Sequence, residues 1–289
     1  MASQEKPLPT LHSGIIGLIT SWFTKDITLA RNFPSATHKI QAIGSSSLQK
    51  GIAFVNAHLP SSNLKPTIYA KYNGVYNDPE VDIVYIGTPH SLHKRHCLDA
   101  IAGGKHVLCE KAFTLNAAEA RKVFAAAQAK GVFIMEAMWT RFRPLILELR
   151  HVLFEEKAIG DVRRTFCDFG LEIDIASLPA TSRQHTNERP KVTTVQTLRD
   201  GIDVASSFLL HYPSTGRHGI LFCTTEARTP EVFARIKGTE GYITVQGVAA
   251  SSPRAFTVYR KRKAGSSSTG EDGSSEGERH ELELEGMGF

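Results

Sequence analysis

Two short apolar runs that end in polar residues stand out in the first half of the chain. They are Asp82–His90 (DIVYIGTPH) and Lys105–Phe113 (KHVLCEKAF). Each predicts a buried parallel strand, and the amphipathic stretch Ser91–Gly104 between them predicts a helix. Because crossovers between parallel strands are right-handed, both strands are expected to end at one edge of a sheet, where ligands of open α/β sheets bind. The candidate site residues at that edge are Thr88, Pro89, His90, Glu110 and Lys111.

The same strand and helix rhythm extends over residues 1–137 and predicts a doubly wound parallel sheet, a Rossmann fold. Asn116 is expected to cap a helix over Ala117–Lys130, because Glu119 follows three residues later and Gly131 stops the pattern. The other expected strands are Gly14–Ile19, His38–Gly44, Ile68–Tyr72 and Val132–Met135, and the other expected helices cover Ser21–Phe33 and the stretch from Ser47 to Ala57.

After Glu136 the pattern changes to one helix, Pro144–Glu156, followed by strands without helices between them. This pattern predicts a second domain, residues 138–289, an α+β domain with a mostly antiparallel open sheet. Its expected strands are Val162–Gly170, Val192–Leu198, Val204–His211, Gly219–Thr225, Phe233–Lys237, Tyr242–Gln246 and Phe256–Arg260.

The composition is that of a soluble globular protein, with 41% hydrophobic and 22% charged residues in 289. No apolar run approaches the roughly 18 residues of a membrane span, and the first residues lack a signal-peptide pattern, so a cytoplasmic protein without a membrane partner is expected. The four cysteines form no C-x-x-C pair, so neither a disulfide framework nor a zinc ribbon is indicated. The net charge of +5 is scattered apart from Arg260–Lys263, so no nucleic-acid partner is expected.

Two further signals are weak when they are taken alone. His90, His93 and His96 have a spacing of three residues, but they sweep around a helix rather than converge, so no metal is expected. The first strand-helix turn reads Gly17–Thr20 (GLIT) and carries one glycine, where a dinucleotide fold needs two close together so that backbone amides can approach a pyrophosphate. A glycine that merely ends a strand explains this position equally well.

Three motifs taken together carry a resemblance to a known family. They are Glu110-Lys-Ala112 after a strand, Met135–Phe142 (MEAMWTRF) and Ile159–Arg163 (IGDVR). In order and spacing they resemble the glucose-fructose oxidoreductase and inositol dehydrogenase family, in the branch of dimeric dihydrodiol dehydrogenases and NADP-dependent D-xylose dehydrogenases. The resemblance implies a hydride transfer between nicotinamide and a sugar or trans-dihydrodiol C–OH. It also implies a C-terminal sheet that often forms a dimer interface, so a homodimer is a hypothesis for this chain.

The resemblance also assigns roles to positions of this sequence. Lys111 matches the catalytic lysine that orients the reacting hydroxyl, and its charge would favour a developing alkoxide. NADP is expected in preference to NAD, since serine hydroxyls near the adenosine ribose can bind a 2′-phosphate. The positions that match cofactor-binding or nicotinamide-pocket residues are Gly17, Ser45, Ser46, Ser47, Thr88, Pro89, His90, His93, Glu110, Glu136, Ala137, Trp139 and Arg141.

The chain departs from the family pattern at several points. The phosphate turn looks two residues short after Gly17, and Ala112 replaces a proline, so any cis peptide bond there is expected to be lost or strained. No tyrosine lies between Tyr85 and Tyr212, where the family carries its acid-base tyrosine, and the chain stops before the expected final helices. A shortened sequence of an active enzyme and a catalytically inactive nucleotide-binding or interaction protein are therefore both open.

Overall fold

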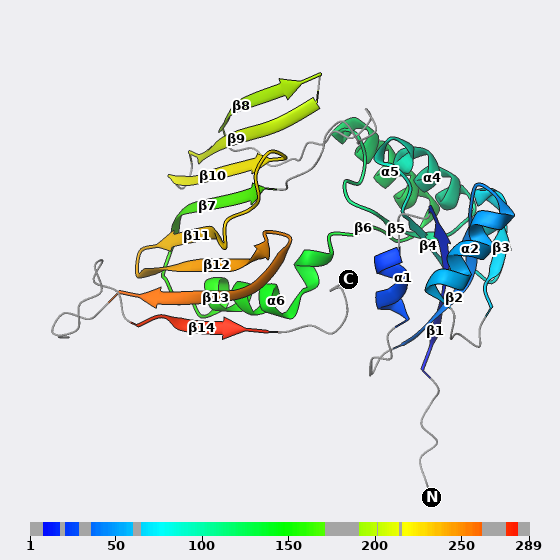
Figure 1. Ribbon diagram of the computed structural model, residues 1–289, viewed down its shortest axis with the longest axis horizontal. Helices are drawn as coiled ribbons and strands as arrows, with labels where there is room; N and C mark the ends of the chain where they lie inside the picture. Colours follow the sequence, from blue (N-terminus) through cyan, green and yellow to red (C-terminus); the bar gives the residue numbers. More distant parts are fainter. Residues whose placement is uncertain are drawn as a thin grey trace, which may run out of the picture. The chain divides into compact units, whose positions relative to one another are not determined.

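The computed structural model describes residues 8–17, 21–28, 36–59, 65–170, 191–200, 202–213, 216–261 and 276–282. These residues fall into two compact units, one that ends at Met138 and one that begins at Trp139. Each unit is built on its own sheet (Figure 1).

The first unit contains a sheet with the strand order β3-β2-β1-β4-β5-β6. All of its neighbouring strands are parallel. This is the order of the doubly wound dinucleotide-binding fold, so the expected fold class is confirmed. The strands are β1 (Thr10–Ile16), β2 (Thr37–Gly44), β3 (Thr67–Tyr69), β4 (Ile83–Ile86), β5 (His106–Cys109) and β6 (Ile134–Glu136).

Helices cover both faces of this sheet because successive strand residues point to opposite sides. Ile16 packs into a core with α3, α4 and α5, whereas its neighbour Ile15 packs into a second core with α1 and α2. The helices are α1 (Ser21–Ile27), α2 (Leu48–His58), α3 (Tyr72–Asn77), α4 (His90–Ala102) and α5 (Ala117–Lys130).

The observed bounds of some strands and helices differ from the expected ones. β1 starts at Thr10 rather than at Gly14, because its polar first half pairs with β2. The strand expected to reach Tyr72 stops at Tyr69, and the helix α3 follows it. That helix is short and contains Gly74 and two asparagines, so local propensity gives little signal, and burial of its apolar side chains stabilises it instead. Residues 29–33 of the expected first helix lie outside the described part of the chain.

The second unit contains an eight-stranded sheet with the order β14-β13-β12-β11-β7-β10-β9-β8. Among the described strands of this second sheet, only β7 and β10 pair in parallel, so the expected mostly antiparallel sheet is confirmed. The strands are β7 (Val162–Gly170), β8 (Lys191–Arg199), β9 (Ile202–Tyr212), β10 (Arg217–Thr224), β11 (Val232–Gly238), β12 (Gly241–Ala249), β13 (Ser252–Arg260) and β14 (Glu278–Glu281). The sequence patterns did not indicate β14.

One helix, α6 (Pro144–Arg150), covers part of this sheet and continues into a wider turn over His151–Glu155. Its buried Leu145 and Leu149 pack with Phe256 and Ile243 of the sheet. The expected helix Pro144–Glu156 therefore has the right position, although its last turn is not α-helical.

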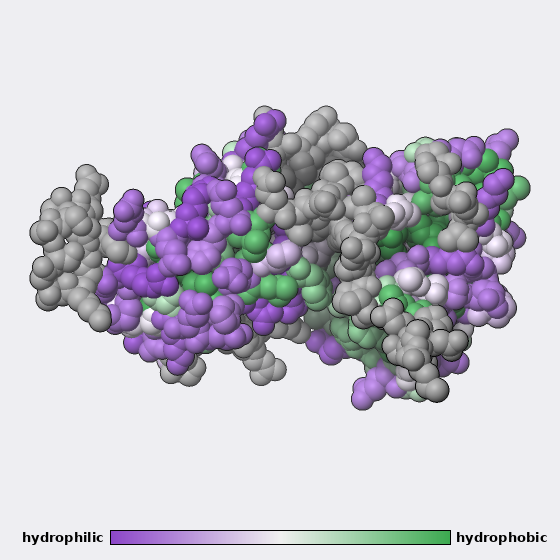
Figure 2. Space-filling view, turned by 90° about the horizontal axis from the view of Figure 1, so that it is seen from below, coloured by the Kyte–Doolittle hydropathy of each residue, from purple (hydrophilic) through white to green (hydrophobic). Residues whose placement is uncertain are grey.

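The surface seen in Figure 2 is mainly hydrophilic, with hydrophobic residues interspersed among the charged ones. In the part of the chain that the structure describes, no helix is both long enough and apolar enough to span a bilayer.

Candidate functional site

The candidate site of the first unit lies where β4 and β5 end. The two strands are parallel neighbours, so the residues after Ile86 and after Cys109 leave the sheet at the same edge. Main-chain bonds join the exits: Gly87 N–H donates to Ile16 O at 2.9 Å, and Glu110 N–H donates to Ile86 O at 2.9 Å. The structure thus places the two polar stretches side by side.

The segment Glu110–Phe113, here called the lysine segment, is held by side chains from three neighbouring elements. Tyr85 of β4 donates its hydroxyl hydrogen to Glu110 Oε1 at 2.5 Å. His90 Nε2 of α4 donates to Lys111 O at 3.1 Å. Glu136 Oε1, at the end of β6, accepts from Phe113 N–H at 2.9 Å. The segment therefore has few ways to move without breaking a hydrogen bond.

Lys111 itself is exposed, and its ammonium has no ion-pair partner among the described residues. Its main-chain N–H donates to Glu110 Oε2 at 3.1 Å. The main chain is thus fixed while the charged end of the side chain is free to meet a ligand.

The peptide bond between Lys111 and Ala112 is cis. The expectation was that any cis geometry here would be lost or strained, and the structure shows that it is not lost. The carbonyl oxygens on both sides of this bond are contacted, that of Lys111 by His90 and that of Ala112 by His93 at 2.9 Å.

His93 is fully buried, and both nitrogens of its ring face main-chain carbonyls. Nδ1 lies 2.9 Å from Ala112 O, and Nε2 lies 2.7 Å from Thr88 O. The ring therefore links the exit of β4 to the exit of β5, and it leaves no nitrogen for a cofactor.

Gly17 occupies the turn after β1 with φ of +81°, a conformation that glycine adopts without strain. A Cβ atom there would lie 2.4 Å from the carbonyl oxygen of Gly87 and 2.7 Å from the nitrogen of Thr88. The glycine is thus required by close approach to the exit of β4 as well as by its backbone angle.

The three serines after β2 have different surroundings. Ser45 is buried and its Oγ has no protein partner, whereas Ser47 Oγ accepts from Lys50 N–H and caps α2. Ser46 is exposed, and Lys50 Nζ lies 3.4 Å from its hydroxyl. Lys50 was not among the residues predicted from the sequence, although its position in the first turn of the helix after β2 could have indicated it.

Other polar atoms at this edge are buried without a protein partner. They include Thr88 Oγ1 and His90 Nδ1, in addition to Ser45 Oγ. Burial lowers the pKa of His90, and the neighbouring His93 and Lys111 lower it further, so the ring is neutral at neutral pH. Unpartnered buried polar atoms are rare in folded proteins, and here they supply hydrogen-bonding groups for a polar ligand.

The remaining predicted residues have separate surroundings. Pro89 is exposed and occupies the position before α4 without a side-chain capping bond, and Ala137 is buried with its N–H donating to Cys109 O at 2.7 Å. Trp139 and Arg141 lie in the short helical turn Trp139–Phe142 of the second unit, where the Arg143 guanidinium lies 5.5 Å from the Trp139 ring.

The histidines of α4 do not form a metal site. His96 contacts the Tyr76 hydroxyl with its Nδ1 at 3.0 Å, while His93 faces two carbonyls. Among the described residues, no group of three or more His, Cys, Asp or Glu side chains is arranged to hold a metal ion.

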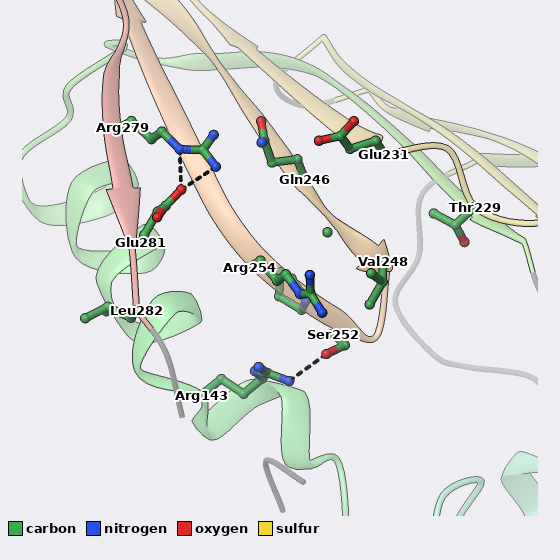
Figure 3. Close-up of a pocket in the computed structure, with 12 residues that line it drawn as sticks. Arg143, Thr229, Glu231, Gln246, Val248, Ser252, Arg254, Arg279, Glu281 and Leu282 are labelled. Atoms are coloured by element: carbon green, nitrogen blue, oxygen red, sulfur yellow. Dashed lines mark hydrogen bonds and ion pairs between the residues drawn. The ribbon is translucent and has the colours of Figure 1, made fainter. Parts of the chain in front are cut away.

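The second unit has a cavity of about 810 Å³ at the ends of β12, β13 and β14 (Figure 3). The Arg143 Nη1 donates to Ser252 Oγ at 3.2 Å at one side of this cavity, and Arg279 pairs with Glu281 at another. None of the residues singled out from the sequence lines it.

Comparison with known proteins gives matches over most of the chain. The profile described as "Oxidoreductase family, NAD-binding Rossmann fold" matches residues 11–138. Trans-1,2-dihydrobenzene-1,2-diol dehydrogenase of Mus musculus is 33% identical over 276 residues, which cover 88% of this chain and 79% of that protein. The Homo sapiens protein of the same name is 32% identical over 249 residues, or 79% of this chain and 71% of that one.

Solved structures share the fold at lower identity. A levoglucosan dehydrogenase in complex with NADH and levoglucosan aligns with a TM-score of 0.74 and 18% identity, over 94% of this chain and 80% of that one. A 3-ketoreductase from Actinomadura kijaniata in complex with NADP aligns with a TM-score of 0.72 and 19% identity, over 94% and 84% of the two chains. At these identities the likeness concerns the fold alone.

Proposed function

The chain belongs to the oxidoreductase family with an NAD-binding Rossmann fold, and from this premise we propose that it transfers a hydride between NADP and a C–OH group of a trans-dihydrodiol or a D-xylose-like sugar. The observation that carries this proposal is the free ammonium of Lys111, on a segment fixed by hydrogen bonds at the edge where ligands bind.

The residues at this edge fit a dinucleotide. Gly17 lets the first turn lie against the main chain of Gly87 and Thr88, and the buried hydroxyls of Ser45 and Thr88 have hydrogen bonds to offer to a dinucleotide. Bound NADP would supply C4 of its nicotinamide as hydride acceptor or donor.

NADP is favoured over NAD by the residues that come directly after β2. A carboxylate at this place would bind the ribose hydroxyls of NAD and repel a 2′-phosphate. Here the residues are serines, and the ammonium of Lys50 lies 3.4 Å from the hydroxyl of Ser46. We expect Lys50→Ala to weaken NADPH binding about tenfold, as for loss of one charged contact, and to leave NADH binding unchanged. Fluorescence titrations of both cofactors measure this, and an equal loss for both would contradict it.

Lys111 is assigned the catalytic role. Its ammonium would donate a hydrogen bond to the substrate oxygen and stabilise the alkoxide that forms as the hydroxyl proton leaves to solvent. The carbonyl group then forms as the hydride leaves the carbon. Glu110, His90, His93 and Glu136 hold the segment that carries this lysine, so in this proposal they position it instead of contacting the substrate.

The test is to compare Lys111→Met with Lys122→Met, a change at an exposed lysine on α5. We expect the Lys111 variant to lose on the order of 10²-fold or more in kcat, with NADPH affinity retained, and the Lys122 variant to match the wild type. The assay follows NADPH absorbance with trans-dihydrodiols and D-xylose as substrates. An absence of saturable NADPH binding to the wild type would reject the proposal.

A second candidate, a catalytically inactive nucleotide-binding or interaction protein, is favoured by one feature of the sequence. No tyrosine lies between Tyr85 and Tyr212, so the family's acid-base tyrosine has no counterpart. Tight NADPH binding without turnover of either substrate class would select this candidate.

Three further expectations belong to the proposal. They are a cofactor-binding domain over residues 1–137 with a substrate and dimerisation domain over 138–289, a homodimer, and a cytosolic location. Limited proteolysis, light scattering and cell fractionation test them in turn.

A further inference from the structure

Tyr85 is a buried residue whose polar end is turned to the site. It lies on β4 with an exposed fraction of 3%, and its ring stacks on Phe23 of α1 with centroids 3.7 Å apart and planes 2° apart. Its hydroxyl donates to Glu110 Oε1 at 2.5 Å. Burial raises the pKa of Tyr85, and the Glu110 carboxylate raises it further, so the hydroxyl remains a donor throughout the neutral range.

Glu110 uses both carboxylate oxygens. Oε1 accepts from the Tyr85 hydroxyl, and Oε2 accepts from Lys111 N–H at 3.1 Å. An ionised carboxylate is the side chain that accepts at two oxygens without offering a donor. The carboxylate thus links the Tyr85 hydroxyl to the main chain of Lys111.

The Lys111 residue is held from both sides. Its N–H meets the Glu110 carboxylate, and its carbonyl meets His90 Nε2 at 3.1 Å. The directions of the N–H and C=O groups of a residue fix the direction of its Cα–Cβ bond, which is where the side chain starts. Rotation of Glu110 would release one of these two restraints.

We propose that Tyr85 is a positioning residue for the hydride-transfer reaction, which acts through Glu110 to fix the direction in which the Lys111 side chain enters the site. This inference rests on the proposed function for the role of Lys111, while the link from Tyr85 to Lys111 rests on the hydrogen bonds alone. A purely structural role would require only the ring of Tyr85, which packs against Phe23.

The test is Tyr85→Phe, which keeps the stacked ring and removes the hydroxyl. The matched control is Tyr76→Phe, because Tyr76 is equally buried and its hydroxyl contacts His96 on α4 instead of the lysine segment. The first measurement is amide hydrogen exchange of Lys111 in protein labelled at lysine, with its signal assigned by its loss in Lys111→Arg. We expect exchange at Lys111 to rise about five- to tenfold in Tyr85→Phe alone.

The second measurement is steady-state kinetics. We expect kcat of Tyr85→Phe to fall about ten- to a hundredfold, because a misplaced catalytic group loses rate without losing cofactor contacts, while KM for NADPH stays within about twofold. Tyr76→Phe should keep the wild-type kcat even if its melting temperature falls as much.

Each outcome is decisive. If the amide hydrogen exchange of Lys111 is unchanged in Tyr85→Phe, the link from Tyr85 to Lys111 is overturned. If kcat falls equally in both tyrosine variants, the effect is a general structural one and the positioning role is overturned. If the wild type itself shows no turnover, the proposed function fails, and the exchange data alone then decide whether Tyr85 holds Lys111.

Discussion

Two turns at the carboxyl ends of the strands of the first sheet, at Gly17 and in the lysine segment, are shaped in opposite ways. At Gly17 the chain needs the absence of a side chain, because a Cβ would overlap the main chain of Gly87. In the lysine segment the chain needs side chains, because Tyr85, His90 and Glu136 occupy its main-chain and carboxylate groups. The first turn should fail abruptly when it is altered, whereas the second should weaken one hydrogen bond at a time.

The two turns should therefore tolerate substitutions differently. An overlap between two backbones is relieved only by moving a backbone, since neither has a side-chain rotamer to change. A network of hydrogen bonds can lose one member and keep the others. Substitutions in each turn, paired with matched controls, should therefore differ in the size of their effects.

Gly17→Ala should be the most damaging change. A left-handed alanine costs about 1 to 2 kcal/mol, and forced overlap with Gly87 adds about 1 to 3 kcal/mol to the loss of unfolding free energy. Gly104 also has a positive φ, of 76°, but nothing lies within 4 Å of its missing Cβ. Gly104→Ala should therefore lose only the first part, and urea unfolding of both variants measures the difference. Equal losses would show that the close approach to Gly87 is unimportant.

Glu136→Ala should have an intermediate effect on the lysine segment. The change leaves the N–H of buried Phe113 without its acceptor, which costs about 1 to 3 kcal/mol of unfolding free energy. Glu136→Gln retains an oxygen at the same place and should lose less than about 1 kcal/mol. If urea unfolding gives the same loss for both, charge rather than the hydrogen bond holds Phe113.

Asn116→Ala, three residues after the lysine segment, should have a smaller effect. Its side-chain oxygen accepts from Glu119 N–H at 3.0 Å and starts α5, and loss of such a cap costs about 1 kcal/mol. Ser47→Ala, which removes the longer 3.3 Å cap of α2, should lose less. Thermal unfolding of the two variants tests the order, and a larger loss for Ser47→Ala would contradict it.

The helix α5 shows how far the sequence alone can lead. Its two ends follow from Asn116 and Gly131, since capping depends on residues within one turn. Parallel order likewise follows from alternating strands and helices. By contrast, α3 and β14 carry little local signal, and they exist because tertiary neighbours bury the first and pair with the second.

The site is predictable in the same partial way. That Thr88, His90, Glu110 and Lys111 share one edge follows from the rule for parallel strands, and the structure places them there. Sequence could not show that Glu110, His93 and Glu136 turn toward the main chain, because a carboxylate or imidazole chooses among partners that only the folded register brings near. Tyr85 was missed for the same reason.

The smallest predicted effect concerns His90 and depends on pH. Burial lowers the pKa of His90 below its ordinary value of 6.5, so the unfolded chain binds a proton that the folded chain resists. Stability contributed by the neutral ring is therefore complete above about pH 7 and is lost as pH falls through 6.5 toward the folded pKa. Gln does not titrate, and its amide can still donate to the carbonyl of Lys111. The free energy of unfolding of His90→Gln should accordingly fall less than that of the wild type between about pH 7 and pH 5.5. Urea unfolding of both proteins at several pH values measures this difference. Parallel pH curves for the two proteins would mean that His90 is not held neutral and that its ring is a looser part of the network than Tyr85 or Glu136.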